Sequence, residues 1–467
     1  MKDPAAPLTE GPIARTLVAF ALPILFGNVL QSMNGSVNSI WVGRFLGEAA
    51  LSATANANAV LFLLLGGVFG VSMAATILIA QYIGAGNLPE ARRVVGTSAT
   101  FFATLAIVIS VAGWLLAPRL LAAMHTPPAS IELASSYLRI IFIAIPFLYL
   151  YAYVMAIMRG AGDSNTPFKF LLLSVGLDIV LNPLLIFGFG PVPRLGIAGS
   201  ALATLVANGV SLIALIAFLY RRQHPLCLRA DDLRLLKLDG AIVGTLIRKG
   251  LPMGLQLVVI SANAVALITL VNRFGTDTTA AYGAAWQLWN YLQMPAFAIG
   301  AAVSSMAAQN VGAGRWDRVG QIAGAGVAFH CLLTGTLVLV LVALNKLALG
   351  LFLPPGEALE IAGHINRTSA WSFVFFGISM VLFGVVRSTG AVVPPLVALF
   401  IALWLVRIPM AIGFAPRFGA DAIWWSFPVA SAVAALLAFL YYRYGPWRKA
   451  RMMPAPAAPG AAESLAE

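Results

Sequence analysis

The sequence predicts an all-α integral membrane protein whose 12 transmembrane helices form two six-helix lobes related by a pseudo-twofold axis. Two observations support this fold class. The 467 residues are 60% hydrophobic and only 10% charged, against about 45–50% and about 25% in soluble domains. The chain also repeats itself, because residues 80–86 read AQYIGAG and residues 308–314 read AQNVGAG, an offset of 228. A duplication across so apolar a chain indicates two similar lobes embedded in the membrane.

Apolar runs of about 20 residues or more, the length that crosses a bilayer, follow one another along the chain. They are predicted at 16–43, 53–82, 94–117, 134–158, 168–189, 197–220, 242–272, 280–310, 321–345, 362–386, 392–414 and 422–444. Six fall in each repeat, so both halves enter the membrane in the same direction and the pseudo-twofold axis lies along the membrane normal. The predicted organisation is a cytoplasmic N-terminus (1–15), an N-lobe (16–220), an amphipathic cytoplasmic linker (221–241), a C-lobe (242–445) and a disordered cytoplasmic tail (446–467).

The net charge of +12 is unevenly distributed across the predicted loops. With the N-terminus inside, the cytoplasmic segments hold 20 of the 29 lysines and arginines, and the opposite loops hold 8. This bias follows the positive-inside rule and places both termini in the cytoplasm, so the charge does not indicate nucleic acid. The remaining cation, Arg407, falls inside a predicted span, where a structural role is preferred and a substrate or lobe contact stays open. The alanine-rich composition and the lack of organelle signals favour a bacterial inner membrane.

The sequence lacks the motifs of an enzyme or of an ATP-driven pump. It has no Gly-x-x-x-x-Gly-Lys-Ser/Thr phosphate loop, no His-Glu-x-x-His and no metal-ligand spacing among its four histidines. The two cysteines, Cys227 and Cys331, indicate no disulfide framework. We therefore expect no enzyme activity, no cofactor and no tightly bound metal. The energy source would then be an ion gradient, which requires a polar site inside the bilayer.

A single carboxylate stands out as that site. Of the 17 carboxylates, 16 fall in predicted loops, termini or span ends, and Asp178 lies near the middle of the fifth span. An acid there costs roughly 2.5–3.5 kcal/mol on insertion scales and is functional by default. Polar residues with helical spacing accompany it, namely Asn182 on the fifth span, Ser200, Thr204 and Asn208 on the sixth, and Gln31, Asn34 and Asn38 on the first. Helices in lipid turn such faces toward one another, so we expect them to converge on Asp178, with plain helix–helix packing as the open alternative.

The second repeat does not copy this constellation. An offset of 226, which superimposes Pro183 on Pro409, places Trp404 opposite Asp178. An offset of 229 places Leu267 opposite Asn38, although Asn34 keeps a counterpart in Asn263. The coupling site is therefore expected in the N-lobe alone.

Aromatic and amide groups on the eighth span form a candidate substrate cavity. Flat organic cations bind to aromatic faces, and ordinary packing or an aromatic belt at the membrane interface is an equally good interpretation. The candidate residues are Trp286, Gln287, Asn290 and Met294, together with Tyr149 on the fourth span.

Several motifs together resemble the multidrug and toxic compound extrusion (MATE) family over about residues 12–445. They are Leu22-Pro23 and Leu251-Pro252, Val42-Gly43-Arg44, the two glycine-rich repeats, Arg159-Gly160-Ala161-Gly162-Asp163, the run 181–188 and the run 196–204. The resemblance implies a V-shaped efflux antiporter that expels amphipathic, often cationic compounds in exchange for Na⁺ or H⁺. It also implies a cation site at positions that look like Asn38, Asp178, Asn182 and Thr204. Where the family has an acid on the first helix, this chain has Asn38. On the fifth helix the order of the family's Asn and Asp pair is reversed, so that Asp178 precedes Asn182.

The expected coupling ion is H⁺, because Asp178 is one carboxylate among neutral amides, while transient Na⁺ at Asp178 stays open. The expected partners are small organic substrates and the lipid bilayer, with no nucleic acid and a monomeric protein. A flippase for lipid-linked oligosaccharides is the alternative of related architecture, disfavoured because the spans carry almost no cation to hold a pyrophosphate. A membrane enzyme or sensor lacks any catalytic constellation.

Overall fold

The computed structural model describes residues 8–123, 126, 128–188 and 193–452, and the regular elements in these segments are helices. The first half contains α1 (Ile13–Leu46), α2 (Glu48–Gly84), α3 (Leu88–Ala123), α4 (Pro128–Gly160), α5 (Asn165–Phe187), α6 (Ile197–Arg221) and the 3₁₀ helix η1 (Ala230–Leu236). The second half contains α7 (Gly240–Val271), η2 (Asn272–Phe274), α8 (Thr276–Gly312), α9 (Trp316–Ala343), α10 (Asn345–Leu349), α11 (Glu357–Ser369), α12 (Ser372–Arg387), α13 (Val393–Phe400), the π-helical η3 (Ile401–Arg407), α14 (Ile408–Gly413), α15 (Ala415–Phe418), α16 (Asp421–Tyr444) and η4 (Pro446–Lys449).

Each predicted span has a helical counterpart, although two of them are broken. The tenth span is the pair α11 and α12, bent by 42°, and the eleventh is α13, η3 and α14 in succession. In the described part of the chain, ten helices are long and apolar enough to cross a membrane, or eleven with the bent pair. α8 is long enough but falls outside this group, because its 37 residues include the polar side chains Gln287, Asn290, Gln293, Gln309 and Asn310.

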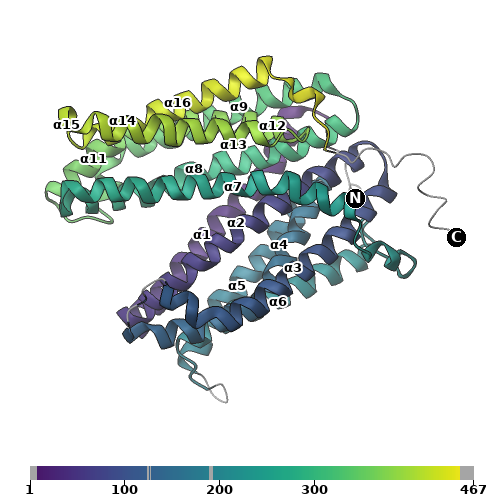
Figure 1. The fold of residues 1–467 in the computed structure, drawn as a ribbon, viewed down its shortest axis with the longest axis horizontal. Coiled ribbons are helices and arrows are strands. Elements are labelled where there is room, and N and C mark those ends of the chain that lie inside the picture. The colour runs from purple at the N-terminus through teal and green to yellow at the C-terminus, as the bar shows by residue number, and fades with distance from the viewer. Residues whose placement is uncertain (1–7, 124–125, 127, 189–192, 453–467) are drawn as a thin grey trace.

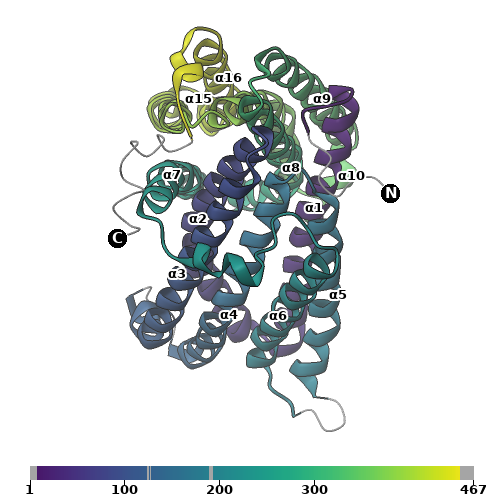
Figure 2. The same ribbon diagram turned by 90° about the vertical axis from the view of Figure 1, so that its right-hand side faces the viewer.

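The helices form two bundles that converge at one end and diverge at the other, which gives a V (Figure 1). α1 to α6 make the lower arm of the V in this view, and α7 to α16 make the upper arm. The convergent end, which faces the viewer in Figure 2, also carries the linker between the arms. The pseudo-twofold repeat of the sequence is therefore visible as two arms that meet at the end of α2 and the end of α8.

Two glycines allow this meeting. A Cβ on Gly84 would overlap the backbone of Gln309, and a Cβ on Gly312 would overlap the backbone of Gln81. The same glutamines reach across to the other arm, since Gln81 Nε2 donates to the Ser388 carbonyl oxygen at 2.6 Å and Gln309 Nε2 donates to the Gly160 carbonyl oxygen at 2.9 Å. The two contacts are related by the sequence repeat, because an offset of 228 converts Gln81 to Gln309 and Gly160 to Ser388. The closed end is therefore held by a symmetric interlobe clasp.

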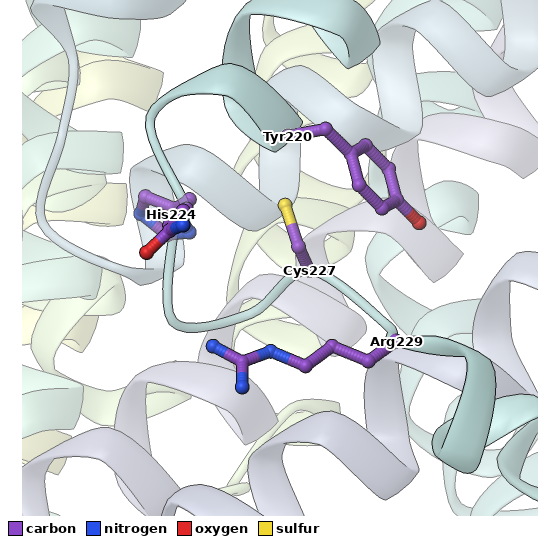
Figure 3. Close-up of a pocket in the computed structure, with 5 residues that line it drawn as sticks. Tyr220, His224, Cys227 and Arg229 are labelled. Atoms are coloured by element: carbon purple, nitrogen blue, oxygen red, sulfur yellow. The ribbon is translucent and has the colours of Figure 1, made fainter.

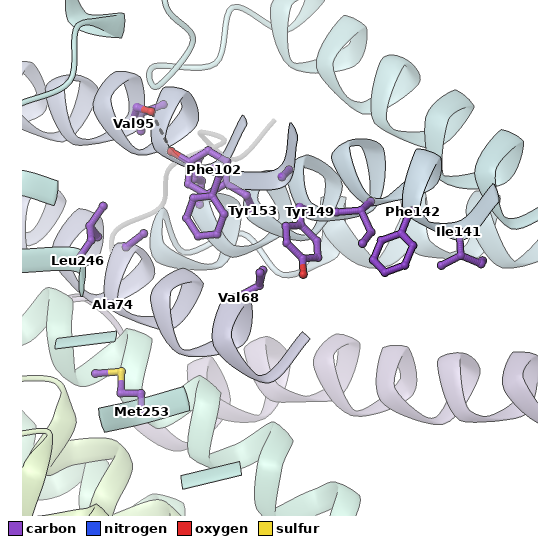
Figure 4. Close-up of a cluster of buried hydrophobic side chains, with 14 of the residues drawn as sticks. Val68, Ala74, Val95, Phe102, Ile141, Phe142, Tyr149, Tyr153, Leu246 and Met253 are labelled. Carbon is purple, nitrogen blue, oxygen red and sulfur yellow. Dashed lines mark hydrogen bonds between the residues drawn. The ribbon is translucent and has the colours of Figure 1, made fainter. Parts of the chain in front are cut away.

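α1 and α7 each pack against both arms. The first half of α1 contributes Leu17 and Phe20 to a core shared with α8, α9 and α12. The first half of α7 contributes Leu246 and Met253 to the large core of α2, α3 and α4 (Figure 4). The second half of α1 is thereby left to pack on α5, where it carries the polar face predicted from the sequence.

The linker and the start of the tail are packed onto the closed end. Thr100 Oγ1 of α3 donates to the Leu236 carbonyl oxygen at 2.7 Å, so η1 is bound along α3. The tail from residue 446 is predicted to be disordered, and its first residues differ from that expectation. Trp447 is buried, and its carbonyl oxygen accepts a hydrogen bond from Thr389 Oγ1 at 2.8 Å. The indole provides the apolar anchor that the Pro/Ala-rich remainder lacks, and residues 453–467 lie outside the described chain.

Candidate functional site

Asp178 lies on the inward face of α5, one helical turn before Asn182. The α-helix continues through Pro183 to Phe187, so both polar side chains keep the same face. Asp178 is 3% exposed and Asn182 is fully buried. An ionised carboxylate at this depth requires hydrogen-bond donors from its neighbours.

One carboxylate oxygen is held by α1. Asn34 Nδ2 and Asn38 Nδ2 donate to Asp178 Oδ2 at 2.8 and 2.7 Å. Asn38 also accepts a hydrogen bond, because Asn182 Nδ2 lies 3.0 Å from Asn38 Oδ1. The two α1 amides are one helical turn apart, so the spacing of the stripe delivers both to the same oxygen.

The other carboxylate oxygen is held by α6 and by α5 itself. Thr204 Oγ1 donates to Asp178 Oδ1 at 3.2 Å, and Asn182 Nδ2 lies 3.3 Å from the same atom. Asn208 Nδ2 donates to the Thr204 carbonyl oxygen at 2.8 Å, and the Ser200 carbonyl oxygen lies 3.4 Å from Thr204 Oγ1. Asn208 and Ser200 therefore support Thr204, which in turn contacts the acid.

Two amide oxygens beside the acid are unused. Asn34 Oδ1 and Asn182 Oδ1 are buried and have no hydrogen-bond partner among the described residues. Together with the carboxylate they form a set of hard oxygen donors, which suits a small cation or a proton and not a soft transition metal. The described residues hold no group of three or more His, Cys, Asp or Glu that could bind a metal ion.

The structure thus brings Asp178, Asn182, Asn38, Thr204 and Asn34 into one network. Asn34 is a direct donor, whereas the sequence predicts it only as part of a supporting face. Gln31 is exposed on α1, and the α1 donors to Asp178 are Asn34 and Asn38.

The candidate cavity residues do not lie together on one open surface. On α8, Gln287 is exposed and Trp286, Asn290 and Met294 are half-buried. Tyr149 is only 1% exposed and lies in the hydrophobic core of the first arm, beside Val68 and Phe142 (Figure 4). It therefore packs inside that arm and does not line an open surface with α8.

A separate pocket of about 250 Å³ lies where α6 leads into the linker. Tyr220, Gln223, His224, Cys227 and Arg229 line it (Figure 3). Burial lowers the pKa of His224 below its ordinary value and raises the pKa of the Cys227 thiol, because both charged forms lose solvation. None of these residues belongs to the Asp178 network.

Comparison with known proteins decides the family. The profile of the MatE family matches residues 23–184 and 252–412, which is most of both arms. The chain belongs to the MatE family. Similar proteins include the probable multidrug resistance protein YoeA of Bacillus subtilis, 36% identical over 93% of this chain and 94% of that protein. The probable multidrug resistance protein NorM of Thermotoga maritima is 26% identical and covers 94% of each chain.

Solved MATE structures share the fold. A MATE structure in the straight conformation matches with a TM-score of 0.87 at 21% identity and covers 95% of this chain and 98% of its own. A mutant of the Vibrio cholerae MATE transporter VcmN matches with a TM-score of 0.85 at 21% identity, over 92% of this chain and 96% of its own. MATE transporters have 12 helices in two lobes, so the predicted fold class is confirmed. As a MatE protein, this chain is a multi-pass transporter of the membrane and not an enzyme.

Proposed function

We propose that this MatE protein is a secondary active multidrug efflux antiporter of a bacterial inner membrane. It exports amphipathic, often cationic organic compounds in exchange for H⁺, with Na⁺ as the alternative ion, and Asp178 couples the two movements. The names of its relatives support multidrug export. The observation that carries the coupling role is the convergence of donors from α1, α5 and α6 on one buried acid.

Neutralising Asp178 changes what the network can do. The charged acid accepts from Asn34, Asn38 and Thr204, and so ties α1 and α6 to α5. A protonated acid gains an O–H donor and loses acceptor strength on that oxygen. The unused Asn34 Oδ1 offers an acceptor for such a proton. Ion binding would therefore change the packing of α1 on α5, and because α1 also packs against the second arm, it would bias the relative position of the two arms.

The charge distribution supports the proposed orientation of the antiporter. The closed end carries the linker, which is rich in the cations that face the cytoplasm under the positive-inside rule. In this proposal both termini are cytoplasmic, the protein acts as a monomer, and the V opens to the outside.

The decisive experiment compares the wild type with Asp178→Asn in proteoliposomes loaded with a cationic dye. A pure pH gradient and a pure Na⁺ gradient are applied in turn. We expect the wild type to export dye in response to the pH gradient and Asp178→Asn to lose that response while keeping its membrane level and thermal unfolding. Asp277→Asn, which neutralises an exposed acid at the start of α8, is the matched control and should behave as the wild type.

Other outcomes have clear meanings. A response to the Na⁺ gradient alone changes the ion and keeps the role of Asp178. Full gradient-driven export by Asp178→Asn contradicts the coupling role. A wild type that responds to neither gradient contradicts the antiporter. A susceptibility panel in a pump-deficient bacterium, with the same three proteins, identifies the compounds that are exported.

A further inference from the structure

The second arm holds a cation at the place where the first arm holds its acid. Asn34 and Asp178 are hydrogen-bonded and 144 positions apart. Asn263 and Arg407 are also 144 positions apart, and Arg407 Nη1 donates to Asn263 Oδ1 at 3.1 Å. A shift of 229 carries each residue of the first pair onto the second. The two arms therefore present corresponding polar pairs of opposite charge.

The π-helical segment η3 explains why the sequence repeat conceals this correspondence. α5 begins at Asn165 and α13 begins at Val393, a shift of 228. A π-bulge adds one residue to a helix, so the shift becomes 229 at Arg407, which ends η3. The hydrogen bonds therefore make Arg407 the counterpart of Asp178, whereas the alignment on prolines makes Trp404 its counterpart.

Arg407 has more hydrogen-bond donors than its surroundings use. Its guanidinium stacks on Phe427 of α16, with Cζ 4.5 Å from the ring centroid, and donates a hydrogen bond to Asn263. Its Nε is buried without a partner, and among the described residues no carboxylate oxygen lies within 4 Å of it. A guanidinium carries five N–H donors, and leaving a buried charge without a counter-charge is costly.

The neighbouring amide is oriented toward the cation. Asn263 is 2% exposed, and its Nδ2 is committed to the Leu403 carbonyl oxygen at 2.8 Å. This bond turns Asn263 Oδ1 toward Arg407 and fixes one side of the guanidinium. Arg407 itself is half-buried, so part of the side chain stays accessible. The N–H groups that Asn263 does not use can donate to a planar anion in the forked geometry that suits a carboxylate.

We propose that Arg407, oriented by Asn263 and Phe427, is an anion subsite that takes the carboxylate of an amphipathic organic substrate. The proposal rests on the proposed efflux function and names a substrate class for it. With this guanidinium in the second arm, the protein accepts compounds that carry an anionic group beside the cationic group of the proposed substrates.

The test uses two dyes that differ by one charge, rhodamine B, which has a free carboxylate, and its ethyl ester, which has none. Export and equilibrium binding are measured with the full chain in proteoliposomes for the wild type, Arg407→Gln and Arg407→Lys. Arg417→Gln is the matched control, because Arg417 is an exposed arginine that contacts Phe418 outside this cluster. We expect Arg407→Gln to lower the rhodamine B to ester ratio about tenfold, the effect of losing a charged hydrogen bond. Arg407→Lys should lower it less, since it keeps the charge without the fork, and Arg417→Gln should leave it unchanged.

Three results would overturn the proposal. The first is an equal loss of both dyes in Arg407→Gln, which indicates a packing or coupling role. The second is an unchanged ratio in Arg407→Gln and Arg407→Lys. The third concerns the rhodamine B to ester ratio of the wild type. If this ratio is lost in membranes that contain phosphatidylglycerol but is present in phosphatidylcholine alone, a lipid phosphate occupies the site.

Folding failure and failure of the proposed function are distinguishable from these results. If Arg407→Gln does not fold, the wild-type binding ratio and Arg407→Lys still decide the question, and equal wild-type binding of both dyes overturns the subsite. If the wild type exports neither dye, the efflux function fails, while the binding ratio still tests the subsite.

Discussion

The closed end of the V makes a strong prediction about Gly84→Ala. The added methyl group would overlap the Gln309 backbone, so α2 and α8 must separate at their ends. Overpacking of this kind costs about 1–3 kcal/mol. Separation also weakens the hydrogen bonds from Gln81 to Ser388 and from Gln309 to Gly160, each worth about 1 kcal/mol. The sum is about 3–5 kcal/mol, and its lower end already corresponds to a shift on the order of a hundredfold toward the state that is open at this end.

Thiol labelling measures that shift. Cys227 and Cys331 are replaced by serine, and a single cysteine is introduced by Ser388→Cys, at a side chain that is fully buried under the clasp. We expect slow maleimide labelling in this parent and much faster labelling when Gly84→Ala is added. Gly320→Ala is the control, because nothing lies within 4 Å of its Cβ position. Equal labelling of Gly84→Ala and the parent, at equal membrane level, would refute the steric argument.

Two further predictions concern the linker. Asp239 caps α7 by accepting from the Ala241 and Ile242 amides at 2.8 and 3.2 Å. Asp239→Ala should therefore lower the free energy of unfolding by about 1 kcal/mol, measured by thermal or denaturant unfolding. An unchanged free energy would contradict the cap. Burial lowers the pKa of His224 in the folded protein below its ordinary value of 6.5. As the pH falls, the unfolded chain therefore binds the proton before the folded protein does. The free energy of unfolding should fall as the pH drops below 6.5 and level off below the folded pKa. His224→Asn should remove this slope while keeping an acceptor for the Leu226 amide, because its side-chain oxygen takes the position of Nδ1. Identical slopes in both proteins would rule out His224 as their source.

The Asp178 network is largely predictable from the sequence for a physical reason. A carboxylate is so costly in lipid that its position in the middle of a span stands out, and helical periodicity then places Asn38, Asn182 and Thr204 beside it. Periodicity cannot say that Asn34 reaches the same oxygen as Asn38, because that depends on how closely α1 approaches α5. Apolar and aromatic residues carry no comparable cost, which is why the sequence allows Tyr149 to be assigned to a cavity while it lies in a core.

Backbone irregularities set the other limit of prediction. The extra residue of η3 changes the register of the repeat by one, so sequence offsets taken from prolines miss the correspondence between Asp178 and Arg407. The burial of Trp447 depends on contacts with the segment after α12, which local composition does not encode. The polar face of α8 lowers its hydropathy below that of a typical span. The sequence repeat still identifies α8 as a span, because a segment can be recognised as the copy of α2 whatever its hydropathy.

Asn38→Asp tests whether the amide at this position sets the ionic behaviour of the site. Asn38 Nδ2 lies 2.7 Å from Asp178 Oδ2, and the substitution replaces that donor with a second carboxylate oxygen of the same shape. Two carboxylates at this distance cannot both be ionised without a proton or cation between them. The variant should therefore bind one more proton or Na⁺ per transport cycle than the wild type, which is measured as the number of ions moved per exported dye in proteoliposomes. Asn38→Leu, which removes the donor without adding charge, is the control and should weaken export without changing this number. If Asn38→Asp and the wild type move the same number of ions per dye, the ion is bound elsewhere, because two adjacent carboxylates in so buried a site need a further cation between them.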